Sequence, residues 1–329
     1  KPLRICNEFL EHIVNVPDMT QTEITRWSSE VKFLKAYYHY LLFSQYGPIP
    51  LIRKNANIDA TGDELMPRRE PVDEVVDYIV ELLDEAIKGL PARVTNTSEL
   101  GRIDQVIAKS FKAKVLMLAA SPLFNNNPIY ASFADKDGNL LFPTGDTNVE
   151  KEKWVKAADA LKEAITAAEA AGVKLYEFTK NVPDFDAGNY ANDPRVKYMY
   201  NYQYAMVDKW NTELIWGASR VYTDWHEIQR SVNFKSRDES STGDAWQWLS
   251  VTMNAVDMFY TEAGLPMEED PDFDYENRYN LITIPDSYSS VAVPGDQTVA
   301  MHMGREPRFY ASIGFDRSIQ QTVRTAGLF

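Results

Sequence analysis

The sequence predicts a mainly α-helical fold, in which a helical N-terminal half packs against a C-terminal half rich in loops, short strands and short helices. Before residue 175, apolar residues recur at three- and four-residue spacing, the period of an amphipathic helix. From residue 176 onward such runs are scarce, and glycine, proline, asparagine, aspartate and aromatic residues are frequent. We therefore divide the chain into 1–175 and 176–329. Because no low-complexity linker separates the halves, we expect them to form one composite domain.

The first predicted helices are bounded by glycine and proline. Residues 30–45 are apolar on nearly all sides, which is typical of a buried helix, and Gly47 and Pro48 end the segment. The next helix occupies residues 71–91, with a proline at each end, apolar residues on one face and acidic residues on the other.

Two further helices complete the first half. Residues 104–120 and 150–171 repeat the amphipathic pattern, and Gly172 stands where a left-handed helix cap is expected. The small residues and closing proline of the second helix resemble part of the tetratricopeptide pattern, which has a period of about 34 residues. Because the first-helix signature is absent and residues 121–149 form a long insertion, we expect irregular tetratricopeptide-like repeats.

The second half is predicted to contain short elements. Residues 250–260 are expected to include a short helix, and residues 266–294 to form a loop with little regular structure. Alternation at period two predicts that four tyrosines share the buried face of a β-strand: Tyr198, Tyr200, Tyr202 and Tyr204.

Composition and charge exclude several partners. The net charge of -14 repels phosphate backbones, so we expect no nucleic acid partner and no docking of a basic patch on anionic lipid. No stretch approaches the ~20 apolar residues of a membrane span. Cys6, the only cysteine, is expected to be a core thiol, and no apolar signal segment precedes it. Membrane association is therefore expected only through a lipid anchor that this chain lacks.

The sequence carries no catalytic signature. Phosphate-binding, serine hydrolase and zinc protease motifs are absent, so we expect no enzyme activity, no catalytic residue, no cofactor and no metal. His39 lies in an apolar helix and is expected to be a hydrogen-bonded core residue. Residues 270–276 carry alternating carboxylates that could bind calcium, although a solvated acidic loop is favoured.

Motifs spread along the chain, in a consistent order, resemble those of one family. The segment 30–38 (EVKFLKAYY) is similar to E-x-R-F-L-R-A-Y-Y, with lysine at both arginine positions. The other matching segments are 46–51 (YGPIPL), 72–91, 119–125 (AASPLFN), 211–216 (NTELIW), 252–266, which ends in GLP, and 305–310 (REPRFY).

On these motifs the chain is identified as a member of the SusD/RagB family. The resemblance implies a tetratricopeptide-like half that packs on a TonB-dependent outer-membrane transporter, and an irregular half that holds the ligand. It also implies a lipid-anchored protein on the extracellular face of the outer membrane that captures glycans, or sometimes peptides. Because a lipobox and the usual C-terminal helices are missing, the chain looks like an internal portion of a longer protein.

Aromatic residues in the second half supply the candidate ligand site. Sugar rings have apolar C–H faces and polar edges, so a glycan site needs flat aromatic platforms beside hydrogen-bonding groups. Five of the seven tryptophans fall between residues 210 and 248. The candidate ligand-binding residues are Trp246, Trp248, Tyr222 and Trp225, with the adjacent Asp224 and His226.

Several other residues are expected to be structural. Any single tryptophan is more often core than ligand-binding, and Trp216 follows two apolar residues and is expected in the core. Asn125 is expected to cap a helix, and Arg305 and Arg308 to form structural ion pairs.

Four functions remain open on the sequence alone. The leading hypothesis is non-catalytic capture of a glycan for delivery to a transporter. A peptide-capturing relative would use the same aromatic residues as pockets, and a helical scaffold would have no small-ligand site. A glycosidase, which needs only two suitably placed carboxylates, ranks last.

Overall fold

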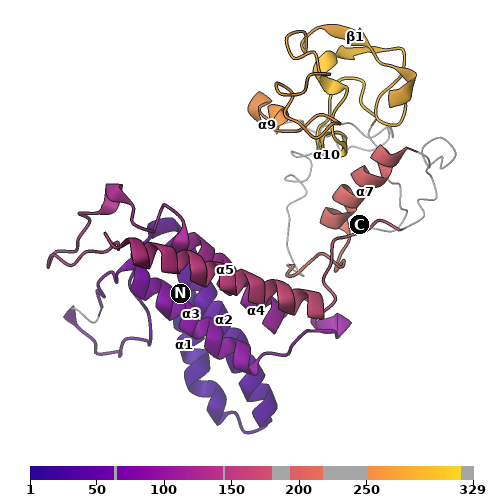
Figure 1. The fold of residues 1–329 in the computed structure, drawn as a ribbon. Coiled ribbons are helices and arrows are strands. Elements are labelled where there is room, and N and C mark those ends of the chain that lie inside the picture. The colour runs from indigo at the N-terminus through magenta and orange to yellow at the C-terminus, as the bar shows by residue number, and fades with distance from the viewer. Residues whose placement is uncertain (63–64, 144, 180–192, 218–249, 320–329) are drawn as a thin grey trace. The chain divides into compact units, whose positions relative to one another are not determined.

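The computed structural model describes residues 1–62, 65–143, 145–179, 193–217 and 250–319 (Figure 1). These residues form two compact units, one containing 1–174 with 214–217 and the other 175–213 with 250–319. Helices dominate, and the strands among the described residues are short. The predicted mainly α fold, with irregular tetratricopeptide-like helices followed by short elements, is confirmed.

The first unit is a series of helices in which each packs against the next (Figure 1). This succession of neighbouring helical pairs is the arrangement expected of helical repeats. The helices are α1 (Pro2–His12), α2 (Gln21–Tyr46), α3 (Val72–Gly89), α4 (Gln105–Ala120) and α5 (Thr147–Ala170).

Helix α2 begins and ends at clear local signals. The Thr20 side chain accepts a hydrogen bond from the Glu23 N–H at 3.3 Å, and the Glu23 carboxylate accepts one from the Thr20 N–H at 2.8 Å. Gly47, with φ of 66°, ends the helix. The expectation that this helix is buried on all sides is wrong at its C-terminal end, where Leu41 and Leu42 are exposed.

In the hydrophobic core of the first unit, aromatic side chains pack α2 against its neighbours. The fully buried Phe33 ring lies 5.4 Å from Phe111 of α4 and 5.5 Å from Trp216. Trp216 donates its indole N–H to the Gly101 carbonyl at 3.3 Å and remains 38% exposed. Trp216 therefore lies at the margin of the core, because its polar edge reaches a surface carbonyl. The prediction that Trp216 lies inside the core is wrong.

Alanines let α4 and α5 approach each other closely. Ala113 of α4 and Ala160 and Ala164 of α5 form a buried cluster between the two helices. Helix α5 ends as predicted, because Gly172 adopts φ of 82°. The Val173 N–H then bonds the Ala168 carbonyl at 3.0 Å, which satisfies a carbonyl at the helix end.

We expect Gly89→Ala to destabilise the first unit by about 1–2 kcal/mol, despite the better helix propensity of alanine. A Cβ on Gly89 would lie 2.3 Å from Ser29 Oγ and 3.2 Å from the Thr25 carbonyl oxygen, both on α2. Denaturant unfolding measures the loss. In the Ser29→Ala background the nearest atom is absent, so the same glycine substitution should cost less. Equal costs in the two backgrounds would contradict this close approach.

The second unit contains α7 (Pro194–Val207), α9 (Met253–Asp257) and α10 (Pro307–Ser312). Strands β1 (Leu281–Thr283) and β2 (Gln297–Val299) pair antiparallel, with Ile282 opposite Thr298. A single-turn 3₁₀ helix, Ala300–His302, follows β2. The short helix expected within 250–260 is confirmed as α9.

The tyrosine segment is a helix, so the predicted strand is wrong. Asp193 caps α7 by accepting a hydrogen bond from the Arg195 N–H at 2.9 Å, and Pro194 occupies the first turn. At 3.6 residues per turn, alternate tyrosines fall on opposite faces. Tyr200 is accordingly 5% exposed, whereas Tyr198 is 57% exposed.

Arg305 lies in the core of the second unit and is fully buried. Its guanidinium donates to four backbone carbonyls, those of Phe259 at 2.7 Å, Val256 and Met301 at 2.9 Å, and Tyr260 at 3.4 Å. The prediction of an ion pair is therefore wrong for Arg305, because backbone carbonyls hold its guanidinium. It is right for Arg308, which pairs with Glu306 at 2.7 Å.

Among the residues that the structure describes, no helix is both long enough and apolar enough to cross a bilayer.

Candidate functional site

The candidate ligand residues chosen from the sequence lie outside the described residues. These are Trp246, Trp248, Tyr222, Trp225, Asp224 and His226. The structure consequently does not test whether they come together, and they stay predictions. Two hollows in the described part of the chain, one in each unit, are candidates for a ligand site.

The hollow of the second unit has a volume of about 530 Å³ and a mixed polar and apolar lining. It lies where the start of α9, the 3₁₀ turn after β2 and the segment following α10 meet. Phe315 and Met301 supply apolar surface, and Ser312, His302 and Arg317 supply polar groups. Such a mixture of apolar walls and a few polar groups is typical of a small-molecule site.

His302 is held in one orientation inside this lining. The Thr298 hydroxyl donates its single proton to the Asp316 carbonyl at 3.1 Å, so at 2.8 Å it accepts from His302 Nδ1. The imidazole also stacks on Phe315 with ring centroids 4.6 Å apart. This pattern assigns the neutral Nδ1–H tautomer and leaves Nε2 as an acceptor.

The charge of His302 follows from its surroundings. Burial lowers the pKa of His302 to about 4, and the nearby Arg305 guanidinium acts in the same direction. The ring is therefore uncharged near neutral pH. A neutral acceptor beside serine hydroxyls and an arginine suits hydroxyl-bearing ligands.

The sequence analysis missed this hollow. His302 was one of four scattered histidines, and no spacing connects it with Phe315 or Thr298. Its position just before the 305–310 motif was the one signal that could have drawn attention to it.

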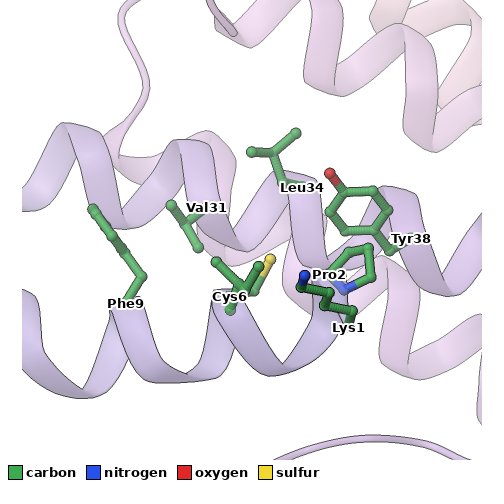
Figure 2. Close-up of a pocket in the computed structure, with 8 residues that line it drawn as sticks. Lys1, Pro2, Cys6, Phe9, Val31, Leu34 and Tyr38 are labelled. Carbon is green, nitrogen blue, oxygen red and sulfur yellow. The ribbon is translucent and has the colours of Figure 1, made fainter.

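The hollow of the first unit is an apolar groove of about 390 Å³ between α1 and α2 (Figure 2). Ile5, Cys6 and Phe9 line it from α1, and Val31, Leu34 and Tyr38 line it from α2. Cys6 is buried, as predicted, and burial raises the pKa of its thiol. With little polar lining, this groove suits an apolar side chain better than a hydroxyl-rich ligand.

The acidic segment 270–276 uses two of its carboxylates to hold its own turns. The buried Asp270 accepts a hydrogen bond from the Asp272 N–H at 3.0 Å, and Asp274 accepts from the Asn277 amide at 2.9 Å. Within the described ranges, no group of three or more histidine, cysteine, aspartate or glutamate side chains is placed to hold a metal ion.

Asn125 has the structural role expected from the sequence. Its amide donates to the Ala120 carbonyl at 3.2 Å and to the Glu150 carbonyl at 3.1 Å, which joins the end of α4 to the start of α5.

Two family models match the chain. One, described as starch-binding associating with outer membrane, matches residues 1–117, and the other, the SusD family, matches residues 212–326. Together with the structural likeness described next, these matches show that the chain belongs to the SusD/RagB family. No curated protein matches the chain.

Solved structures of similar fold cover most of this chain. BT4246 is 29% identical, with a TM-score of 0.76 over 94% of this chain and 53% of its own length. A SusD-like protein from Bacteroides fragilis, BF3747, is 20% identical, with a TM-score of 0.58 over 94% of this chain and 46% of its own. A SusD-like carbohydrate binding protein from the same species, BF0978, is 16% identical, with a TM-score of 0.55 over 94% of this chain and 44% of its own. The chain thus spans about half the length of these structures.

Proposed function

We propose that this chain is part of a non-catalytic protein that captures oligosaccharides or polysaccharides at the bacterial cell surface. The observation that carries the proposal is the match of residues 1–117 to the family model described as starch-binding associating with outer membrane. The likeness to BT4246 over 94% of the chain supports the same family assignment. The mixed lining of the His302 hollow is compatible with a ligand rich in hydroxyl groups.

The proposed ligand contacts come from the second half of the chain. Trp246, Trp248, Tyr222 and Trp225 would supply stacking surfaces, and Asp224 and His226 would hydrogen-bond hydroxyl groups. This assignment rests on residue chemistry. Substituting each aromatic residue by alanine tests it, because loss of glycan binding in none of the four variants would refute it.

The proposed partner is a TonB-dependent outer-membrane transporter that receives the captured glycan. In this proposal the helical half, residues 1–175, faces the transporter, and residues 176–329 hold the ligand. The full-length protein would be lipid-anchored on the extracellular face of the outer membrane. These assignments follow from family membership, and the net charge of -14 argues against an alternative role in nucleic acid binding.

Native affinity electrophoresis tests the proposal directly. We expect one class within a panel of plant, host and microbial polysaccharides to retard the purified protein. The matching soluble oligosaccharide, at about 100 times its Kd, should raise the free energy of unfolding by about 2.7 kcal/mol. Folded protein that no polysaccharide retards, but that binds peptides, would favour the peptide-capturing alternative. Turnover of the oligosaccharide would overturn the non-catalytic assignment.

A further inference from the structure

A turn before β1 presents an exposed tyrosine from a firmly held backbone. The Arg278 carbonyl accepts a hydrogen bond from the Met301 N–H at 2.8 Å, and the Asn280 carbonyl accepts one from the Ala300 N–H at 2.9 Å. These bonds attach the turn to the 3₁₀ helix after β2. Tyr279, which lies between the two anchored residues, is 55% exposed.

Arg278 fixes the ring of Tyr279. Its guanidinium carbon lies 3.7 Å from the ring centroid of Tyr275 and 4.4 Å from that of Tyr279. The guanidinium also donates to the Tyr275 carbonyl at 2.6 Å, which sets its position. Cation–π contact therefore covers one face of the Tyr279 ring and limits its rotation. Tyr279 nevertheless remains 55% exposed, so ring surface that Arg278 does not cover is open to solvent.

Amide and carboxylate groups are ordered in the same turn. Asn280 donates from its amide to the Asn277 side-chain oxygen at 3.0 Å, and Asn277 donates to both oxygens of Asp274, at 2.9 and 3.2 Å. All three side chains belong to exposed residues, so their remaining donors and acceptors face water. An open aromatic face beside ordered amide and carboxylate groups matches the apolar faces and hydroxyl edges of a sugar ring.

The charge around this turn selects among glycans. The exposed Asp272, Asp274 and Glu276 lie in the segment that leads into this turn, and the guanidinium of Arg278 lies against the two tyrosine rings. The three carboxylates outnumber the one guanidinium, so a uronate or sulfated sugar would meet net negative charge here. A neutral sugar would not.

We propose that Tyr279, with Asp274 and Asn280 beside it, is a stacking subsite for neutral sugar residues of a captured glycan. This inference rests on the proposed glycan-capture function and adds to it a site and a ligand class. Because the ring is already held by Arg278, little side-chain entropy is lost on binding.

Three variants test the subsite against four probes: a neutral α-glucan, a neutral β-glucan, a galactomannan and polygalacturonate. For each neutral polysaccharide that retards the unmodified protein, Tyr279→Ala should weaken binding about tenfold. Tyr279→Phe should stay within about twofold, because stacking uses the ring face and not the hydroxyl. Tyr198→Ala, which removes an equally exposed tyrosine on α7, is the matched control and should also stay within about twofold.

The outcomes separate the subsite from the function. Undiminished binding by Tyr279→Ala, in a protein that binds neutral glycans, overturns the subsite and leaves glycan capture intact. Retardation by polygalacturonate that Tyr279→Ala abolishes overturns the proposed neutral ligand class. No retardation of the unmodified, folded protein by any of the three neutral glycans overturns the neutral ligand class and with it the subsite, whereas the proposed function fails only if the wider polysaccharide panel also gives no retardation.

Discussion

Replacing Arg305 by methionine is expected to destabilise the second unit by about 3–5 kcal/mol. Methionine keeps much of the side-chain volume but donates no hydrogen bonds. The buried carbonyls of Phe259 and Met301 would then lose the donor that Arg305 supplies, whereas the Val256 carbonyl would keep the Phe259 N–H at 3.3 Å. Each buried acceptor without a partner costs about 1–3 kcal/mol, which accounts for the size of the expected loss.

The geometry explains why these bonds matter to the whole unit. Val256 lies in the last turn of α9, Phe259 follows shortly after that helix, and Met301 lies in the 3₁₀ turn after β2. Arg305 donates to both segments, and its backbone N–H donates to the Tyr310 hydroxyl of α10 at 3.2 Å, so this one residue joins three parts of the core. The carbonyls at the end of α9 also stabilise its positive charge.

Thermal and denaturant unfolding, followed by near-ultraviolet circular dichroism, measure the effect. The matched control is Arg308→Met, because the Arg308 side chain is 54% exposed and, among the described residues, its ion-pair partner is Glu306. An exposed ion pair contributes about 0–1 kcal/mol, so this variant should unfold almost as the unmodified protein does. Similar losses for the two arginine variants would show that the carbonyl network is not what stabilises the core.

The helices of the first unit could be predicted because their burial is periodic along the chain. In α3, for example, Val72, Val75, Ile79 and Leu83 lie on one buried face, which is what their spacing indicates. The same reasoning failed for α7, where tyrosines at every second position imitate a strand. The better signal was local: Asp193 and Pro194 begin a helix through a cap and a compatible φ angle, whatever follows them.

The ligand-facing groups were harder to predict because they depend on loops. The position of Tyr279 over Arg278 depends on backbone bonds to a turn about twenty residues later in the chain, and no periodicity reports such a contact. For Arg305 the sequence suggested a structural ion pair. The actual acceptors are backbone carbonyls up to 49 residues away, which residue identity does not reveal.

The stability of the first unit is expected to fall by about 3 kcal/mol as the pH drops from 6.5 to 4, because of His39. His39 is fully buried, and its Nδ1–H donates to the Lys35 carbonyl at 2.8 Å while Nε2 accepts from the Ile52 N–H at 3.2 Å. The neutral ring is thus satisfied at both nitrogens, as the sequence analysis expected. Protonation of Nε2 would remove the acceptor for Ile52.

Burial and two nearby cations set the direction of this effect. Burial is the main cause that lowers the pKa of His39, from an ordinary value of 6.5 to about 4. The nearby cations Lys35 and Arg53 act in the same direction. Between pH 6.5 and about 4, His39 binds a proton in the unfolded chain but not in the folded chain. The stabilisation is therefore complete above pH 6.5 and is lost as the pH falls to about 4.

Denaturant unfolding at closely spaced pH values, together with an NMR titration of the His39 ring, checks this prediction. His39→Gln is the informative variant, because an amide can bond the same backbone groups without titrating. We expect the glutamine variant to be less stable at pH 7 but to show a flatter pH dependence between 6.5 and 4. A pH dependence unchanged by the substitution would assign the acid loss to other groups.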